Sequence, residues 1–212
     1  MYGPLHYRQL EKEKKAALAL NRGDFNRRLT LSHSATSELR WWVDNTESAY
    51  NVIHHTLPEI TLSSDASNLG WGCACTDSQS GGEGLPEGSS FHINYLELKA
   101  AYFVLKCFPR EVVGKHVRIM IDNTTAVACI SRMGTSHSES CNIMTQTIWR
   151  WCIENKVWVS ASFIPGKENT AADKESKVIT LDMVWKLDPT ALSHAFSLLQ
   201  VHPDIDLFAT AT

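Results

Sequence analysis

From residue 57 onward, short runs typical of β-strands alternate with longer amphipathic stretches, and this order constrains the fold more than any other feature of the sequence. Strands alternate in polarity and favour β-branched and aromatic residues, whereas helices repeat apolar residues every three to four positions. Strands are expected over 60–64, 70–76, 91–93, 117–121 and 157–164, and helices over 94–108, 124–133, 138–155 and 170–177. The sequence therefore predicts an α/β domain built on a five-stranded sheet.

Turn-forming residues divide the chain into a helical appendage, the α/β domain and a C-terminal segment. These parts are expected to span residues 1–56, 57–180 and 181–212. The appendage should contain two helices, over 8–20 and 34–45, and the C-terminal segment one more, over 189–199, followed by a tail. The Gly- and Ser-rich stretch 77–90 is typical of a flexible loop.

Composition and charge limit the class of protein. No apolar stretch approaches the roughly 18 to 20 residues that span a bilayer, and the start is too charged for a signal peptide, so an intracellular protein is expected. The net charge of −3 is atypical of nucleic-acid-binding proteins. However, residues 1–40 carry eight basic and four acidic side chains. The six cysteines form no CxxC pair and are expected to be buried free thiols.

Two aspartates follow strands at positions where open α/β sheets place their functional sites. Asp65 comes directly after the run 60–64, and Asp122 ends the run 117–121. Side chains at the carboxyl ends of strands line the crevice in which such sheets bind ligands. Either residue taken alone is more often a turn former or a helix cap, so neither identifies a site by itself.

Glu97 lies on the face of a predicted helix that should pack against the sheet. It precedes Ala101, Val104 and Phe108 at helical spacing, and these apolar residues form the stripe expected to be buried. An ionised carboxylate in that position costs several kcal/mol unless a cation or a metal ion accompanies it. The alternative is a frayed first turn that leaves Glu97 in solvent, where it favours the helix dipole.

Asp173 is the fourth acidic residue of interest. It lies within the first turns of the helix expected after Pro165-Gly166, and Asn169 is placed to cap that helix. An acid near a helix N-terminus also stabilises the helix dipole. The position of Asp173 alone therefore does not distinguish a ligand from a stabilising charge.

The segments that contain these four carboxylates resemble the motifs of ribonuclease H, in the same order along the chain. They are Leu62-Ser-Ser-Asp65-Ala-Ser, Leu96-Glu97-Leu98-Lys-Ala-Ala101, Ile119-Met-Ile-Asp122-Asn-Thr and Asn169-Thr-Ala-Ala-Asp173. The pattern Ala-Asp-x-x-Ser-Lys at 172–177 is most similar to the domain in retrotransposon polyproteins. More narrowly, Leu5-His-Tyr-Arg-Gln-Leu-Glu, Leu39-Arg-Trp-Trp and Ile205-Asp-Leu-Phe-Ala-Thr resemble its flanks in DIRS-type, tyrosine-recombinase retrotransposons. The appendage would then correspond to the end of a reverse transcriptase.

This resemblance implies a ribonuclease H-like fold, in which three antiparallel strands are followed by two parallel ones and helices flank the sheet. It implies hydrolysis of the RNA strand of RNA/DNA hybrids during reverse transcription, assisted by two Mg²⁺ ions or by Mn²⁺ in their place. Asp65 would bridge the two ions, Glu97 and Asp122 would complete one site, and Asp173 would complete the other. Magnesium prefers such oxygen ligands.

The resemblance also implies partners. The RNA strand of the hybrid would be recognised through its 2′ hydroxyls, without reading of its sequence, and Asn94, Asn123 and Thr124 are the expected polar contacts. A polymerase region of the same polyprotein is the expected protein partner, and no membrane is expected.

The sequence departs from the family pattern at three positions, two of which, Glu175 and Lys177, replace the usual Leu and Arg after the last aspartate. Related domains commonly have a histidine ten residues before the last aspartate, thought to help proton transfer or product release, whereas this chain has Phe163. Phenylalanine cannot transfer a proton. His137, in the loop before the helix 138–155, is an alternative proton carrier, although a solvated loop histidine is the simpler interpretation of that residue.

Other functions fit parts of the sequence. An integrase or transposase of the same fold would place its glutamate on a late helix, whereas Glu97 is on the first helix after the hairpin. A connection domain of a reverse transcriptase lacks the acidic quartet, so the main alternative is a decayed or domesticated binding module. The Trp41-Trp42 region, expected to be exposed, would suit docking of a polymerase, a role compatible with nuclease activity.

Overall fold

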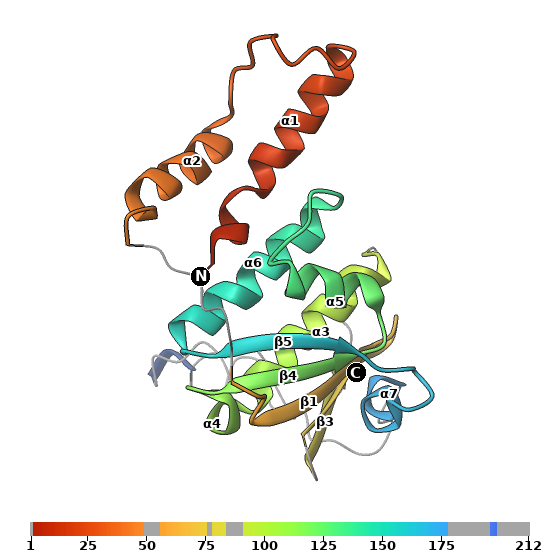
Figure 1. Cartoon of the computed structure of the whole chain (residues 1–212). Helices are drawn as coiled ribbons and strands as arrows, with labels where there is room; N and C mark the ends of the chain where they lie inside the picture. The colour runs from red at the N-terminus through yellow and green to blue at the C-terminus, as the bar shows by residue number, and fades with distance from the viewer. Residues whose placement is uncertain (1, 49–55, 76–77, 84–90, 178–195, 199–212) are drawn as a thin grey trace.

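A five-stranded mixed sheet forms the centre of the computed structural model, which describes residues 2–48, 56–75, 78–83, 91–177 and 196–198 (Figure 1). The strands are β1 (Ile60–Ala66), β2 (Gly70–Cys75), β3 (Ser78–Glu83), β4 (His116–Ile121) and β5 (Trp158–Phe163). Their order across the sheet is β3-β2-β1-β4-β5. The pairs β1–β2 and β2–β3 are antiparallel, and the pairs β1–β4 and β4–β5 are parallel. The predicted arrangement of three antiparallel strands and two parallel ones is confirmed.

Helices cover both faces of this sheet. Those of the α/β domain are α3 (Ile93–Cys107), α4 (Pro109–Val112), α5 (Thr124–Ser131), α6 (Glu139–Glu154) and α7 (Thr170–Lys177). Trp71 of β2 packs on Phe103 of α3, with the ring centroids 4.9 Å apart. The next residue, Gly72, faces α7. Since successive strand residues point to opposite faces, α3 and α7 lie on opposite sides of the sheet.

The third strand is not where the sequence predicts it. The pattern predicts a strand over 91–93, but Ile93 begins α3, and β3 instead occupies 78–83 within the stretch predicted to be a loop. The β3 sequence, Ser-Gln-Ser-Gly-Gly-Glu, has no alternation of polarity, so backbone pairing with β2 defines this strand. Its glycines have a packing reason, because a Cβ atom at Gly81 would lie 3.0 Å from Cβ of Glu175 on α7.

The remaining elements agree closely with the sequence. Helix α3 ends before Pro109, as predicted. Pro109 is the first residue of α4, a short helix that the sequence does not predict. All six cysteines are free, and all except Cys107 are buried. Among the described helices, none combines the length and apolar character needed to cross a membrane. The predicted helix over 189–199 and the tail motif from Ile205 lie outside the described residues, apart from 196–198, which are helical.

The start of the appendage packs into the core of the α/β domain. The appendage consists of a short 3₁₀ helix, η1 (Gly3–His6), followed by α1 (Arg8–Leu20) and α2 (His33–Asn45). Leu5 of η1 is only 6% exposed and belongs to the same hydrophobic cluster as Trp149 of α6. The Tyr2 ring lies 5.8 Å from that of Trp149. The appendage and the α/β domain therefore share one core.

The paired tryptophans of α2 are less exposed than the sequence suggests. Trp41 stacks on His6, with ring centroids 3.9 Å apart, and the indole N–H of Trp42 donates to the His6 carbonyl at 2.8 Å. Both rings are half-buried within the appendage. This arrangement does not support their predicted use as an exposed docking surface.

If the appendage contributes to the core, Leu5→Ala should lower the free energy of unfolding by roughly 2–4 kcal/mol, because it deletes a buried side chain and leaves a cavity. Urea denaturation followed by tryptophan fluorescence measures this loss. Leu20→Ala is the matched control. Because Leu20 is 84% exposed, its truncation should change the free energy of unfolding little. Equal losses in the two variants would contradict the shared core.

Candidate active site

Three of the four predicted carboxylates converge at one end of the sheet. Oxygen atoms of Asp65, Glu97 and Asp122 all lie within 4.8 Å of one another. The parallel register pairs Ser64 of β1 with Ile121 of β4, so the next residues, Asp65 and Asp122, emerge side by side at the carboxyl ends of the two strands. Glu97 comes from the first turns of α3, which packs on β1. Three separate elements thus supply one carboxylate each.

Glu97 is buried rather than frayed into solvent. It is 3% exposed, and its Oε2 atom is buried without a hydrogen-bond partner among the described residues. Burial, and then the charges of Asp65 and Asp122, raise the pKa of Glu97 to about 8, although a backbone hydrogen bond from Ala66 partly opposes them. The protein thus holds a carboxyl group where ionisation is costly, which is the situation that a bound cation relieves.

The other two carboxylates repel each other and Glu97. Burial raises the pKa of Asp65, and the charge of Asp122 adds to this effect. Burial also raises the pKa of Asp122, and the charge of Asp173 adds to it. The hydroxyl of Ser176 donates to Asp65 Oδ2 at 2.5 Å and partly offsets the shift at Asp65. Within the described part of the chain, no salt bridge is formed by any of the three cluster carboxylates.

Asp173 lies near this cluster but does not belong to it. It is on α7, and its Oδ1 atom forms an ion pair with Lys177 Nζ one helical turn later, at 2.5 Å. Its charge raises the pKa of both Asp65 and Asp122, so its carboxylate acts on the cluster through space. The structure brings together three of the predicted ligands, and the metal-binding role of Asp173 stays a prediction.

Close backbone packing holds α7 beside the carboxylates. Gly72 of β2 is paired with Asp65, so both face α7. A Cβ atom at Gly72 would lie 2.1 Å from the Ala172 carbonyl oxygen and 2.5 Å from the Ser176 nitrogen. The Ser67 hydroxyl donates to the Ser176 carbonyl at 2.6 Å. The absence of a side chain at Gly72 is therefore what allows α7 to approach Asp65.

Sequence reasoning missed two polar side chains that support the site. Ser176 donates a hydrogen bond to Asp65, and the sequence indicated this residue only as part of the Ala-Asp-x-x-Ser-Lys pattern. Asn169, predicted to cap α7, instead donates from Nδ2 to the Ser64 carbonyl of β1 at 3.0 Å, and its Oδ1 is buried without a partner among the described residues. Periodicity contains no signal for this contact, because the two residues are 105 positions apart.

The loop after β5 closes on Asp122. A Cβ atom at Gly166 would lie 2.9 Å from Asp122 Oδ2, closer than real contacts of this kind. We therefore expect Gly166→Ala to displace the carboxylate and weaken the affinity of the cluster for a divalent ion by about 10-fold or more, as loss of a ligand's supporting contact does elsewhere. Isothermal titration calorimetry measures the affinity. Lys167→Ala, in the same loop, should not weaken binding, and equal weakening by both variants would reject the steric argument.

The predicted substrate contacts adjoin the cluster. Asn123 Nδ2 donates to Asn94 Oδ1 at 2.9 Å, and Asn123 Oδ1 accepts from the backbone nitrogen of Ala126, which caps α5. Asn94 is one helical turn before Glu97, and Thr124 is the first residue of α5. Asn123 therefore has a structural role, and contact of these three side chains with a substrate stays a prediction.

Phe163 and His137 occupy different surroundings. Phe163 ends β5, is paired with Ile121 of β4, and is 49% exposed, so it lies at the same end of the sheet as Asp122. His137 instead lines a cavity between the appendage and the helices α5 and α6. Of these two residues, Phe163 is the one that the register places at the end of the sheet where Asp122 lies, and a role for either in proton transfer stays a prediction.

Comparison with known proteins finds similarity to solved structures. No protein-family model matches the chain, and no curated protein matches it. Ribonuclease H1 of the halophilic archaeon Halobacterium salinarum NRC-1 is similar at 14% identity and a TM-score of 0.44, over 55% of this chain and 92% of that one. LC11 ribonuclease H1 in complex with an RNA/DNA hybrid is 18% identical with a TM-score of 0.46, over 55% and 93%.

A third similar structure is larger. The foamy viral protease-reverse transcriptase in complex with an RNA/DNA hybrid is 11% identical with a TM-score of 0.41; the match covers 76% of this chain and 27% of the viral one. The strand order and directions described above are those of the predicted ribonuclease H-like fold, and that fold class is confirmed.

Proposed function

We propose that this chain is a metal-dependent ribonuclease H that hydrolyses the RNA strand of RNA/DNA hybrids. The observation that carries the proposal is the cluster of Asp65, Glu97 and Asp122, whose oxygens lie within 4.8 Å of one another. Such a cluster is destabilising by itself, because like charges repel and one buried oxygen has no partner in the described part of the chain. Three carboxylates on separate elements form an oxygen donor set that suits Mg²⁺, or Mn²⁺ in its place. The donor set thus fits the ions that the resemblance implies.

The residues of the chain divide the work of this reaction. Bound divalent ions supply an activated water and positive charge that offsets the negative charge developing on the phosphate. Asp65, Glu97 and Asp122 would hold and orient these ions, and Ser176 fixes the position of Asp65. Asp173 would complete a second ion site once Lys177 releases its carboxylate.

Recognition of the hybrid would come from polar side chains next to the cluster. Asn94, Asn123 and Thr124 would contact the ribose and phosphate of the RNA strand, whose 2′ hydroxyls distinguish RNA from DNA. Contacts to sugar and phosphate position the strand without reading its sequence. A hybrid of any sequence is therefore the proposed substrate.

We also propose that the chain acts with a reverse transcriptase polymerase region of a DIRS-type retrotransposon polyprotein. The support is the similarity of the flanking segments, including Leu5-His-Tyr-Arg-Gln-Leu-Glu. This segment spans the end of η1 and the start of α1, and its Leu5 belongs to the core of the α/β domain. A polymerase preceding this segment would thus be rigidly connected to the nuclease.

Cleavage of labelled duplexes tests the proposed activity. The purified chain should cut the RNA strand of an RNA/DNA hybrid with Mg²⁺ or Mn²⁺, and should leave a DNA duplex of the same sequence intact. Asp122→Asn keeps the shape of the side chain but removes a metal ligand, and should lower the rate by about 10³-fold or more. The proposal is rejected if neither ion supports cleavage, or if both proteins cut equally.

Restoring a proton carrier at Phe163 should increase turnover. Phe163→His places an imidazole at the end of β5 that lies beside Asp122. The side chain at this position is already accessible to water. General acid–base assistance raises rates by about 10²-fold or more where it is well placed, so a gain of at least about 10-fold is expected. Phe163→Leu is the control and should show no gain. An unchanged rate in the histidine variant would reject this role.

A catalytically decayed binding module is the second candidate. Two observations favour it: Phe163 cannot carry a proton, and Lys177 occupies the carboxylate of Asp173. In this case the chain would bind hybrids without cutting them, and neither Phe163→His nor Lys177→Ala would restore cleavage. Cleavage by the unaltered chain rejects this candidate.

A further inference from the structure

Two cysteines meet between the sheet and helix α3, outside the carboxylate cluster. Trp71 of β2 packs on Phe103 of α3, with ring centroids 4.9 Å apart. Cys73 follows Trp71 by two residues, on the same face of the strand, and Cys107, the last residue of α3, follows one helical turn after Phe103. Two residues of a strand and one turn of a helix both advance the chain by roughly 6 Å. The next pair opposite each other after Trp71 and Phe103 is therefore Cys73 and Cys107.

The two thiols are hydrogen-bonded to each other. Cys73 donates from its S–H to the sulfur of Cys107, and the Ser80 hydroxyl forms a second hydrogen bond with Cys107. Ser80 of β3 is paired with Cys73 of β2, so the two side chains lie on the face of the sheet that α3 covers. The hydrogen bond from Cys73 lowers the pKa of Cys107, burial opposes this change, and the Ser80 hydroxyl supports it. The same thiol–thiol hydrogen bond, together with burial, raises the pKa of Cys73.

The two cysteines also differ in their access to solvent. Cys107 is half-buried, whereas the side chain of Cys73 is fully buried behind it. Because the thiolate is the nucleophilic form of cysteine, Cys107 is the group that a reagent in solution meets in a reactive state. Two other cysteines show the opposite situation: burial raises the pKa of Cys129 to about 11 and that of Cys152 to about 12. An accessible thiolate beside a buried thiol is the arrangement that thiol–disulfide exchange requires.

We infer that Cys73 and Cys107 form a redox-active pair, which closes to a disulfide by exchange with a small-molecule disulfide and is reopened by a thiol. The Cys107 thiolate attacks one sulfur of the reagent, whose S–S bond breaks and releases a thiolate. Cys73 then passes its proton to that thiolate and attacks the sulfur of Cys107 in the mixed disulfide. The second half of the reagent leaves as a thiolate. Two electrons thus pass from the protein to the reagent, which is reduced to one thiol and one thiolate.

Closure of this pair would link two elements that hold the carboxylates. Cys107 ends α3, whose first turns carry Glu97, and Cys73 follows Gly72, against which α7 packs. The two sulfurs must approach to about 2.05 Å for the bond to form. Phe108, the next residue, has a non-helical backbone, and helix ends adjust more easily than helix interiors, so Cys107 is placed where such a movement is tolerated. This chemistry does not require the proposed nuclease activity.

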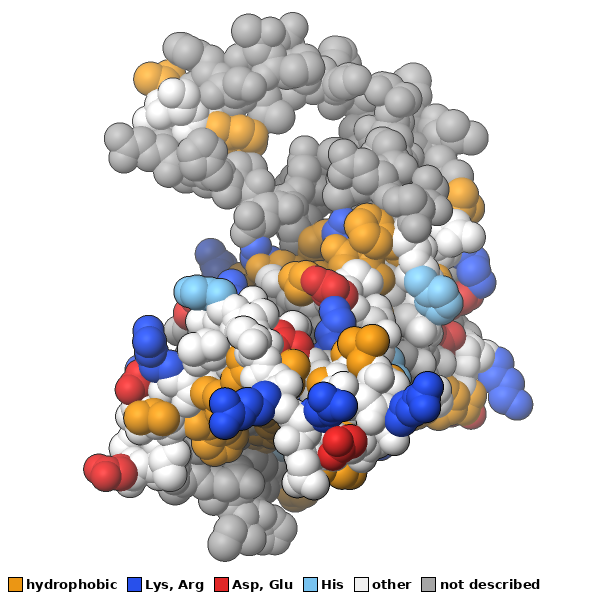
Figure 2. Space-filling model, turned by 90° about the horizontal axis from the view of Figure 1, so that it is seen from above, with side chains coloured by type: hydrophobic (Ala, Val, Ile, Leu, Met, Phe, Trp, Pro, Cys, Tyr) orange, Lys and Arg blue, Asp and Glu red, His pale blue; other side chains and the backbone are white. Residues whose placement is uncertain are grey.

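Treatment of the folded protein with an uncharged disulfide, followed by mass spectrometry, tests the inference. The face on which α1 and α2 lie displays Lys and Arg side chains spread across it (Figure 2), and Arg8 of α1 acts on Cys129, which is itself close to Cys141. An anionic reagent would be drawn to that side, whereas bis(2-hydroxyethyl) disulfide is not. The unaltered protein should lose the mass of two hydrogen atoms, and peptide mapping should find Cys73 linked to Cys107. Excess reducing thiol should reverse the change.

Two substitutions separate the steps of the exchange. Cys73→Ser keeps a hydrogen-bond donor beside Cys107 but cannot form the second bond, so the mixed disulfide on Cys107 should accumulate. Cys107→Ser should abolish both the mixed disulfide and the closed form, because Cys73 is buried. Before exchange, alkylation of the unaltered protein should modify Cys107 at least about 10-fold faster than Cys129.

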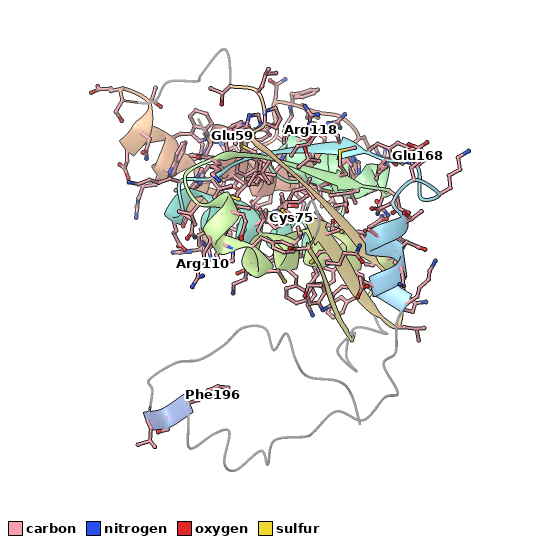
Figure 3. The ribbon with its side chains drawn as sticks, turned by 90° about the horizontal axis from the view of Figure 1, so that it is seen from below. Glu59, Cys75, Arg110, Arg118, Glu168 and Phe196 are labelled. Carbon is pink, nitrogen blue, oxygen red and sulfur yellow. The ribbon has the colours of Figure 1, made fainter. Side chains whose placement is uncertain are left out.

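Cys75→Ser is the matched control, because Cys75 is a buried cysteine of the same strand and lies two residues after Cys73 on the same face (Figure 3). It should leave closure unchanged. The inference is overturned if the map links Cys107 to Cys75, if it links Cys129 to Cys141 instead, or if no disulfide forms in unaltered protein that tryptophan fluorescence shows to be folded. None of these readouts depends on cleavage of a hybrid, so failure of the nuclease proposal would leave this result intact.

Discussion

Glu97→Gln should make the protein more stable at pH 8 in the absence of divalent ions, although it removes a side chain that the proposed reaction requires. Glu97 is buried, one of its oxygens has no partner among the residues that the structure describes, and two other carboxylates lie within 4.8 Å. Glutamine has nearly the same shape but no charge, so it removes the repulsion and most of the cost of burial. The expected gain at pH 8 is on the order of a few kcal/mol.

The sign of the pH dependence follows from the pKa of Glu97, which rises from an ordinary value of 4.5 to about 8 in the folded protein. Between these values the folded protein retains a proton that the unfolded chain releases. Stability should therefore fall as pH rises from about 4.5 to about 8, and this decrease should be smaller in Glu97→Gln. Mg²⁺ should stabilise the unaltered protein more at pH 8 than at pH 6, because ligation requires the deprotonated carboxylate.

Urea denaturation at pH 6 and pH 8, with and without Mg²⁺, measures both effects. Ser37→Ala is a suitable control, because Ser37 is an exposed residue of α2, remote in sequence from the cluster. A Glu97→Gln variant that is less stable than the unaltered protein at pH 8 without metal would mean that Glu97 has a stabilising partner in the fold. In that case the cluster would not be a site prepared for cations.

Gly72→Ala should reduce both stability and activity. The new methyl carbon would lie 2.1 Å from the Ala172 carbonyl oxygen, so α7 must move away from the sheet. Overpacking of this kind costs about 1–3 kcal/mol. Because α7 carries Ser176 and Asp173, a displacement of about 1 Å is expected to lower the cleavage rate by about 100-fold.

Gly114→Ala separates this steric effect from backbone strain. Gly114 has a φ angle of +76°, but a Cβ atom there would meet nothing within 4 Å. It lies before β4, at the end of that strand opposite Asp122. This variant should lose about 1 kcal/mol of stability and keep its cleavage rate. If Gly72→Ala behaves in the same way, α7 does not position the site.

Much of the fold was predictable because its elements have strong local patterns. Helix α3 was expected over 94–108 and is found at 93–107, and its buried face is the stripe on which Glu97 was placed. Strand β3 was not predictable, because its Ser and Gly residues show no alternation of polarity, and Gly81 instead lies against Glu175 of α7. Local patterns of polarity indicate which residues are buried, whereas backbone hydrogen bonds with β2 define this strand, so its sequence contains no such signal.

The same distinction applies to the site. Asp65 and Asp122 were found because each comes at the end of an apolar strand, and the register of β1 and β4 then brings them together. The contact of Asn169 with Ser64 depends on the packing of α7 and has no local signal. The pairing of Asp173 with Lys177 spans four residues of one helix, so helical spacing contains a signal for it, but the prediction of Asp173 as a metal ligand did not use that signal.

The most direct test of the proposed site is the rate of RNA-strand cleavage in an RNA/DNA hybrid as a function of Mg²⁺ concentration, for the unaltered protein and for Glu97→Gln. The carboxylate cluster predicts cleavage that requires the ion and saturates with it in the unaltered protein, and a rate lower by about 10³-fold or more in the variant. Cleavage that persists in chelator, or equal rates in the two proteins at saturating Mg²⁺, would contradict a metal site built on Asp65, Glu97 and Asp122.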